Sequence, residues 1–151
     1  MYKRQGEHLP ITSWKDKSPF FGQIQLKGGK EIFSASFKDR VKTPVDRTQI
    51  VLPPYLPNHP DIIEEYANHL DAIQITDDRV GELIKELKEN DLLKNTIIFF
   101  FSDHGMRLTR HKQFLYEGGL HVPLIITHFT ENKTMIEAGT CLLYTSPSPR
   151  D

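Results

Sequence analysis

A run of five consecutive apolar residues, Ile97–Phe101, limits the fold of this 151-residue chain more than any other feature. Polar residues bound the run on both sides, as expected for a single strand. An apolar side chain at every position, without alternation, is typical of a strand buried on both faces, usually in a parallel sheet covered by helices. The run therefore predicts an interior strand of an α/β domain.

A long helix is expected before this strand, over residues 60–90. Pro60 suits the first helical position, and Asn90 is a plausible end. We expect the apolar stripe of this helix to pack on a sheet, and a break near Thr76 stays open. The stripe consists of Ile62, Tyr66, Leu70, Ile73, Val80, Ile84 and Leu87.

Two further strands are expected, at 20–26 from its alternating pattern and at 122–126 from a second apolar run. Residues 31–49 are polar and irregular, so they predict a surface loop with short ordered pieces. Residues 51–60 contain four prolines, which favours an extended connector. The order of strand, long helix, strand, loop and strand predicts an α/β fold, with a mostly parallel sheet flanked by helices.

The charge balance excludes some classes of function. The chain has 19 Lys plus Arg against 20 Asp plus Glu, and a net charge of −1. A nucleic-acid binder would usually show a basic excess, so we expect no nucleic-acid partner. No apolar run approaches the ~18 residues of a membrane span, so no membrane partner is expected either. The oligomeric state is not predicted.

The two ends differ from the rest of the sequence. Residues 141–151 have no periodicity and resemble the conceptual translation of a transposase-type sequencing adapter, and residues 1–5 fit the opposite strand of the same adapter end. We therefore expect both ends to be artefacts and exclude them from the fold. Because the only cysteine, Cys141, lies in the second of these segments, the cysteine count indicates nothing about redox compartment.

A carboxylate and an imidazole follow the apolar run directly, in Ser102-Asp103-His104-Gly105. Ligand sites form at the carboxyl ends of strands in open α/β sheets. Asp103 and His104 are therefore candidate metal ligands, with glycine allowing the backbone to turn. The alternative is a plain loop in which Asp103 caps the backbone and His104 faces solvent.

The segments NTIIFFFSDHG (95–105), Lys112 and LYEGGLHVPLII (115–126) resemble, in this order and spacing, the sulfatase family of the alkaline-phosphatase-like superfamily. The helix segment DDRVGELIKEL (77–87) is also similar, and residues 53–73 resemble the heparan N-sulfatase-like branch. The resemblance implies that residues 6–140 are the C-terminal part of the core of a sulfatase catalytic domain.

Carried over to this sequence, the resemblance implies that Asp103 and His104 are two ligands of a divalent metal, in this family usually calcium. Calcium seeks six to eight ligands, so the others must come from outside this segment or from substrate. An imidazole suits transition metals better, which leaves the identity of the metal open. Lys112 matches a lysine that contacts the sulfate group, where an ammonium neutralises developing charge. Its alternative is a solvated surface lysine.

Three further positions are weaker candidates. Many sulfatases have a histidine that protonates the leaving group where this chain reads Lys27-Gly28-Gly29-Lys30. Lys30 is a candidate for that catalytic role, whereas Lys27 is expected only to decorate a turn. His111 and His121 flank the lysine loop and the last strand, and either could bind substrate.

The family's nucleophile motif, C/S-x-P-S-R, is absent from residues 6–140. The resemblance implies that a formylglycine residue and the first metal-binding Asp pair lie in missing N-terminal sequence. We expect the parent protein to be a sulfuric ester hydrolase acting on sulfate esters or sulfamates of small molecules or glycans, and this segment alone to be inactive. By family analogy the parent is periplasmic or secreted.

Two alternatives stay open. One is a metal-dependent phosphodiesterase or phosphatase of the same superfamily, in which Asp and His bind zinc. The other is a catalytically dead relative that only binds glycans. The nucleophile upstream would distinguish all three.

Overall fold

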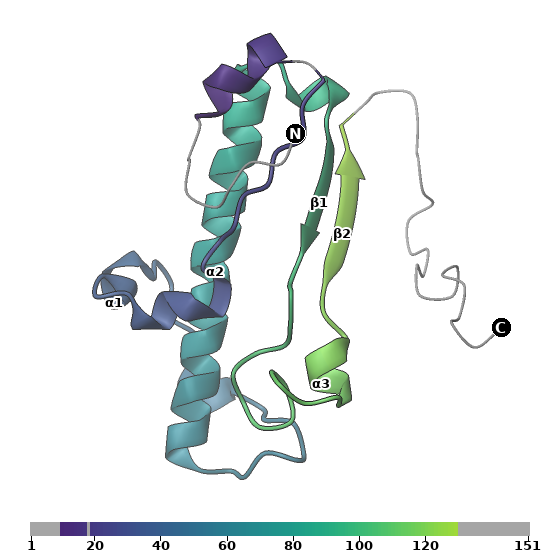
Figure 1. Cartoon of the computed structure of the whole chain (residues 1–151). Helices are drawn as coiled ribbons and strands as arrows, with labels where there is room; N and C mark the ends of the chain where they lie inside the picture. The colour runs from purple at the N-terminus through teal and green to yellow at the C-terminus, as the bar shows by residue number, and fades with distance from the viewer. Residues whose placement is uncertain (1–9, 18, 130–151) are drawn as a thin grey trace, which may run out of the picture.

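A computed structural model describes residues 10–17 and 19–129 of the chain, and one long helix organises them (Figure 1). The 3₁₀ helices, marked η, and the α-helices and strands follow in chain order. They are η1 (Ile11–Lys17), η2 (Gly28–Phe33), α1 (Phe37–Arg40), η3 (Arg47–Gln49), α2 (Pro60–Glu89), η4 (Leu93–Asn95), β1 (Ile97–Phe101), α3 (Glu117–Leu120) and β2 (Leu124–His128). The strands run beside one part of α2, and the loop between them lies beside the other (Figure 1). Segments 1–5 and 141–151 lie outside the described residues.

Helix α2 confirms the predicted helix over its whole length. At its start, Nδ1 of His59 accepts a hydrogen bond from the backbone N–H of Asp61, 3.3 Å away, and Pro60 needs no partner. At its end, the amide of Asn90 donates to the Glu86 carbonyl at 2.8 Å. The helix continues through Thr76 without a break, and the Thr76 hydroxyl donates to the Ala72 carbonyl at 2.9 Å.

The buried face of α2 differs from the predicted stripe. Ala72 and Ile75 are buried with Phe37 of α1, and Ala67 is also fully buried. In contrast, Ile73 of the predicted stripe is 48% exposed. The stripe prediction was wrong here because small residues, which carry little periodic signal, allow η2 and α1 to approach the helix closely. Only the last part of α2 packs on the sheet, where Leu87 is buried with Ile11 and Leu93 against Ile98.

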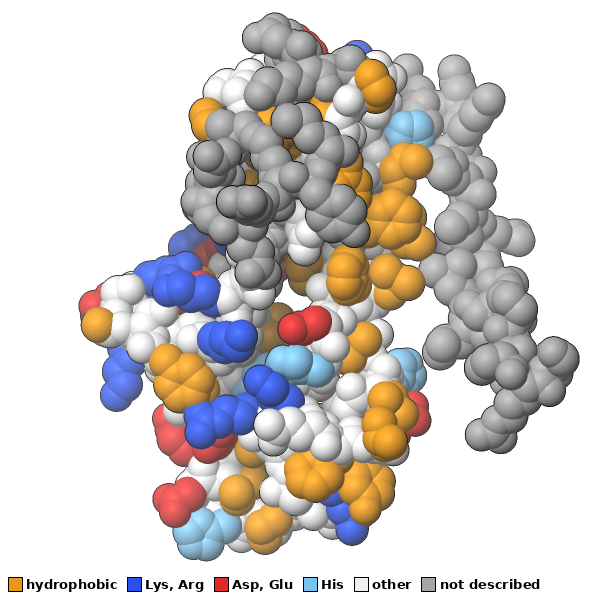
Figure 2. Space-filling view, viewed as in Figure 1, with side chains coloured by type: hydrophobic (Ala, Val, Ile, Leu, Met, Phe, Trp, Pro, Cys, Tyr) orange, Lys and Arg blue, Asp and Glu red, His pale blue; other side chains and the backbone are white. Residues whose placement is uncertain are grey.

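The two strands form an antiparallel pair, with Phe99 opposite Ile126 and Phe101 opposite Leu124. A parallel arrangement was predicted, but periodicity reports burial and not direction. The prediction of burial on both faces was also wrong: Phe99 and Phe101 are 59% and 62% exposed. Ile98 packs toward α2, whereas no described residue covers the opposite face enough to bury it. Figure 2 shows that face as a hydrophobic strip.

The connecting segments agree with the sequence in part. Residues 31–49 hold only short helices, as predicted, and residues 51–59 form the expected connector without helix or strand. The strand predicted at 20–26 does not form, since this extended segment pairs with no strand in the described part of the chain. Its Phe20 instead packs against Trp14 at a tilt of 45° and a centroid distance of 5.3 Å. Within the described residues, no helix is both long and apolar enough to cross a bilayer.

Candidate functional site

The predicted metal ligands lie where β1 ends. The backbone N–H of Ser102 donates to the Pro123 carbonyl at 3.3 Å, which closes the base of the loop between the strands. The Ser102 hydroxyl donates to the carbonyl of His104 at 2.7 Å and tightens the turn. The side chain of Asp103 is 75% exposed, and that of His104 is 34% exposed. The turn therefore presents one carboxylate and one imidazole to solvent.

The chemistry of this pair fits a divalent cation. Nδ1 of His104 lies 2.7 Å from the Gly105 carbonyl, which can only accept, so Nδ1 carries a proton. In the neutral ring, Nε2 then holds a lone pair, and it lies 3.6 Å from Oδ1 of Asp103. Two electron-pair donors this close favour a cation or a proton between them. Within the described residues, no group of three or more His, Cys, Asp or Glu could hold a metal, so Asp103 and His104 would supply only part of a site.

Lys112 lies on the same loop, in a strained backbone. Its N–H donates to the Met106 carbonyl at 2.9 Å. The residues on either side of the His111-Lys112 pair, Arg110 and Gln113, have φ angles of 67° and 74°. Side chains other than glycine seldom adopt this left-handed conformation, which persists where the surroundings enforce it. Among the described residues, the Lys112 ammonium has no hydrogen-bond or ion-pair partner, so its charge is available to an anion.

His111 is the buried anchor of this loop, at 6% exposure. Its Nδ1 lies 2.9 Å from the Gly118 carbonyl, and its Nε2 lies 2.7 Å from the hydroxyl of Tyr55. The carbonyl requires a proton on Nδ1, so the neutral ring accepts from Tyr55 through Nε2. His111 thus links the loop to α3 and to the proline-rich connector. Contact between His111 and substrate stays a prediction.

Three glycines, Gly105, Gly118 and Gly119, let the loop between the strands and α3 lie in close contact. A Cβ on Gly118 would lie 2.5 Å from Nδ1 of His111. A Cβ on Gly105 would collide with the Gly118 carbonyl oxygen. Gly105 of the Asp103-His104 turn and Gly118 of α3 are therefore packing positions, which hold this turn and the lysine loop together.

His69 of α2 belongs to the same cluster, although nothing in the sequence singled it out. Burial lowers the pKa of His69, and the nearby His111 lowers it further. A Cβ on Gly29 would lie 3.0 Å from its Nδ1, so η2 lies directly against this histidine. Lys30 follows Gly29 and is exposed, without a hydrogen-bond or ion-pair partner among the described residues. Lys27 instead donates to the Ser34 hydroxyl at 3.1 Å and serves the turn, as predicted.

His121 lies at the end of α3, where its Nδ1 is 2.7 Å from a carboxylate oxygen of Glu117. Both side chains are exposed, at 73% and 85%. His121 is therefore held at the surface near the start of β2. Its role in substrate binding stays a prediction. Figure 2 shows basic and histidine side chains gathered in the middle of one face.

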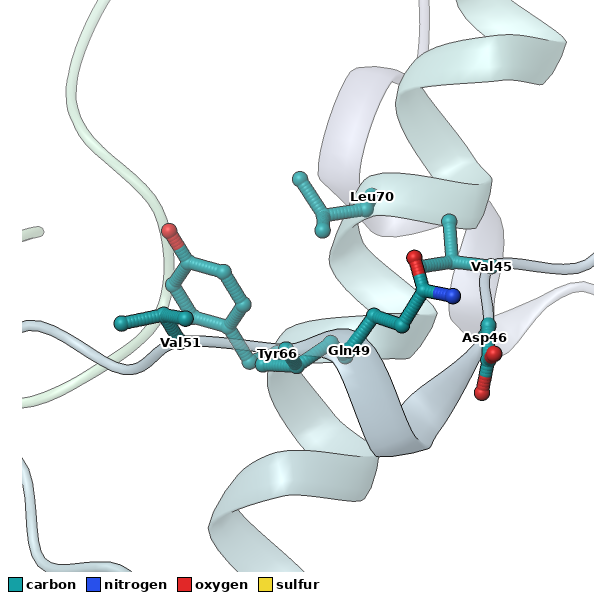
Figure 3. Close-up of a pocket in the computed structure, with 7 residues that line it drawn as sticks. Val45, Asp46, Gln49, Val51, Tyr66 and Leu70 are labelled. Atoms are coloured by element: carbon teal, nitrogen blue, oxygen red, sulfur yellow. The ribbon is translucent and has the colours of Figure 1, made fainter.

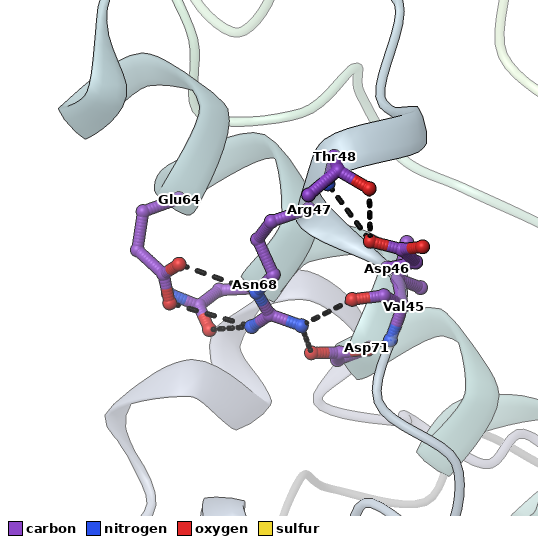
Figure 4. Close-up of polar contacts among 7 residues, drawn as sticks. All are labelled: Val45, Asp46, Arg47, Thr48, Glu64, Asn68 and Asp71. Carbon is purple, nitrogen blue, oxygen red and sulfur yellow. Dashed lines mark hydrogen bonds and ion pairs between the residues drawn. The ribbon is translucent and has the colours of Figure 1, made fainter.

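A buried carboxylate fixes the segment before the proline-rich connector (Figure 4). Asp71 of α2 accepts from the Val45 N–H at 2.8 Å and lies 3.0 Å from Nη1 of Arg47. Arg47 also donates to Glu64 and Asn68. The hydrogen bond from Arg47 is the main cause that lowers the pKa of Glu64, and the same bond raises the pKa of Arg47. Sequence reasoning missed Asp71, because its partners lie more than twenty positions away.

A separate hollow of about 340 Å³ lies between this segment and α2 (Figure 3). Tyr66 and Leu70 of α2 face it, so part of the predicted stripe lines an open space. The other lining residues are Val45, Asp46, Gln49, Ile50 and Val51. None of the predicted site residues lines this hollow.

Comparison with known proteins shows which sequences this chain is similar to. The profile of the Sulfatase family matches residues 10–138. An ulvan-active sulfatase of Formosa agariphila is 39% identical over 79 residues, which are 52% of this chain and 13% of that protein. Arylsulfatase K of Gallus gallus is 51% identical over 55 residues, and that of Homo sapiens 44%; each match covers 34% of this chain and 10% of the relative.

The chain thus spans only about a tenth of the length of the curated relatives it matches. The narrower likeness to heparan N-sulfatases is not shown by these matches. No solved structure matches the chain. The helices and the two-stranded sheet are consistent with the alkaline-phosphatase-like α/β fold that the family profile implies.

Proposed function

Because this chain belongs to the sulfatase family, we propose that the protein containing it hydrolyses sulfate esters or sulfamates, with sulfated glycans or small molecules as substrates. The main support for the proposal is that one loop contains both a candidate metal-binding pair and a candidate sulfate-binding lysine. The Asp103-His104 pair lies at its base, and the ammonium of Lys112, which has no partner among the described residues, lies further along it. His111 and Gly118 hold the two parts together.

Asp103 and His104 would hold a divalent cation, calcium by analogy with the family, together with ligands from elsewhere in the protein. Such a cation would orient the sulfate group and offset its negative charge. The contribution of this chain is the arrangement of the two ligands. The hydrogen bond to the Gly105 carbonyl fixes the ring of His104 and directs Nε2 to the same side as the carboxylate.

Lys112 would contact the sulfate directly. Its ammonium is a compact charge that can neutralise negative charge as the bond between sulfur and the leaving oxygen breaks. No carboxylate of the described residues pairs with it, so no existing ion pair has to be broken when the anion binds. The backbone bond to Met106 and the buried His111 fix where the lysine side chain starts.

Lys30 is the candidate proton donor to the leaving group. It lies beside Gly29, which contacts His69 of the histidine cluster, and its side chain is exposed and unpaired within the described part. We propose that the nucleophile, expected to be a formylglycine residue, and further metal ligands are supplied by sequence outside residues 6–140.

The test begins with the complete reading frame around this sequence. The whole protein is assayed with an aryl sulfate, a sulfated sugar and a phosphodiester. Sulfate release alone supports the proposal, and phosphodiester cleavage alone overturns it. The family match favours the first outcome. An intact, folded protein without either activity would support the glycan-binding relative instead.

Two variants assign the residues. Asp103→Ala should abolish turnover and lower the amount of bound divalent metal, measured by elemental analysis. Lys112→Ala should lower kcat by about 10²-fold or more and leave the metal content unchanged. Lys88→Ala, an exposed lysine near the end of α2, is the matched control and should have no effect. If Lys112→Ala were as active as the control variant, Lys112 would be an ordinary surface lysine without a role in catalysis.

A further inference from the structure

The arginines of the described chain fall into two groups. Arg40, Arg47 and Arg79 each form an ion pair with a carboxylate, at 2.7 to 3.0 Å for the nearest contact. Arg107 and Arg110 have no carboxylate partner among the described residues. Both of these lie on the loop between the Asp103-His104 turn and Lys112 and are exposed. The two guanidinium groups that lack a carboxylate partner among the described residues therefore both belong to the loop that carries the candidate site residues.

These two guanidinium groups contact aromatic rings, whereas the other three described arginines contact carboxylates. The Arg107 Cζ lies 4.9 Å from the centroid of the Phe33 ring. The Arg110 Cζ lies 5.3 Å from the centroid of Tyr116 and 5.8 Å from that of Tyr55. An aromatic ring contacts the face of a guanidinium and leaves the N–H donors at its edge free. Those donors match a carboxylate or a sulfate, which can accept two of them at once.

The backbone also fixes Arg110. Its φ of 67° is unusual for a side chain of this size, and the next residue, His111, is buried and hydrogen-bonded through both ring nitrogens. Tyr55 takes part in both contacts, since its hydroxyl bonds to His111 and its ring meets Arg110. The guanidinium is thus held in advance, which lowers the entropy lost on binding an anion.

We propose that Arg107 and Arg110 form a second anion-binding subsite, which binds a carboxylate or a further sulfate on the sugar next to the one that loses its sulfate. The proposal rests on the proposed function, because it takes the sulfate held by Lys112 as the reacting group. It goes further by naming the substrate class: a glycan with at least two anionic groups on neighbouring sugars.

The test compares substrates in the whole protein. An aryl sulfate carries only the reacting anion, whereas a sulfated disaccharide carries a second anion, either a uronate or another sulfate. Arg107→Gln and Arg110→Gln should each lower kcat/KM for the disaccharides about tenfold, mainly through KM, and leave the aryl sulfate unchanged. The disaccharide that loses more identifies the second anion. Arg79→Gln, whose arginine is ion-paired on α2, is the matched control.

Equal losses on aryl sulfate and disaccharide would overturn the subsite, because they would show a general structural effect. Unchanged kinetics on every substrate would overturn it as well, while leaving the sulfatase proposal intact. A binding measurement separates the two proposals: calorimetry needs no turnover and uses two disaccharides that lack the reacting sulfate, one with a uronate and one with a sulfate on the neighbouring sugar. Loss of binding of either disaccharide in the double variant would support the subsite even if no sulfate were released, and undiminished binding of both would refute it.

Discussion

Replacing Asp71 tests the most deeply buried charge that the structure describes. This carboxylate is 3% exposed, and its two oxygens serve different partners. One accepts from the Val45 N–H at 2.8 Å, and the other lies 3.0 Å from the Arg47 guanidinium. Asp71→Ala removes both bonds. Arg47 keeps Glu64 and Asn68, but the Val45 N–H loses its partner.

The magnitude follows from these contacts. A hydrogen bond to a charged group contributes about 1.5 to 3 kcal/mol, and leaving a buried donor unpaired adds to the loss. Breaking a fully buried ion pair costs about 3 to 5 kcal/mol, but the Arg47 side chain is 32% exposed and keeps other partners. We therefore expect Asp71→Ala to lower the free energy of unfolding by about 2 to 4 kcal/mol.

Chemical denaturation of the purified protein measures this value. Asp71→Asn keeps a carbonyl oxygen for Val45 and loses only the charge, so it should cost about half as much. Asp77→Ala, an exposed carboxylate on the same helix, should change the stability by less than about 0.5 kcal/mol. An Asp71→Ala loss no larger than that of Asp77→Ala would refute the argument.

Three further predictions concern the histidine cluster. Gly118→Ala should destabilise the protein by about 1 to 3 kcal/mol in a thermal melt, since the added Cβ would collide with His111. Gly81→Ala should stabilise α2 slightly, because no atom lies within 4 Å of the added Cβ. An equal response of both variants would contradict the close approach of Gly118 to His111. Because the pKa of His69 is lowered in the folded protein, the contribution of neutral His69 to stability is complete above pH 6.5 and is lost as the pH falls through the folded pKa. His69→Gln should therefore flatten the dependence of the unfolding free energy on pH below 6.5. An unchanged slope in the variant would contradict this role of His69. Tyr55→Phe should lower the free energy of unfolding by about 1 kcal/mol, because the Nε2 of the buried His111 loses its hydrogen-bond donor. Unchanged stability in chemical denaturation would show that the 2.7 Å bond contributes nothing.

Local patterns predicted the elements of this fold well. Helical periodicity and the Pro60 and Asn90 signals located α2, and two apolar runs located β1 and β2. The direction of strand pairing was missed, because a run of apolar residues is the same in either direction. The strand predicted at 20–26 does not form, because a strand needs a partner strand and its own alternating pattern does not supply one.

Sequence patterns identified candidate site residues only where these residues lie close together in the chain. Asp103, His104 and Lys112 stand in a recognisable order on one loop. The contact between Tyr55 and His111 joins residues 56 positions apart, and that between Val45 and Asp71 joins residues 26 apart. Such pairs leave no periodic signal. A charged residue such as Asp71 is read as a surface residue until its distant partner is known.

The loop between β1 and β2 leaves and re-enters the sheet at one place, because Phe101 pairs with Leu124 and Ser102 bonds to Pro123. Strand pairing therefore offsets the conformational entropy that is lost when the loop closes. Contacts within the loop are not needed to offset that loss. This makes the loop an exchangeable module on a fixed base. On the proposed function, replacing Arg107 and Arg110 on this loop is expected to change the preferred substrate while Asp103, at the base, keeps its position.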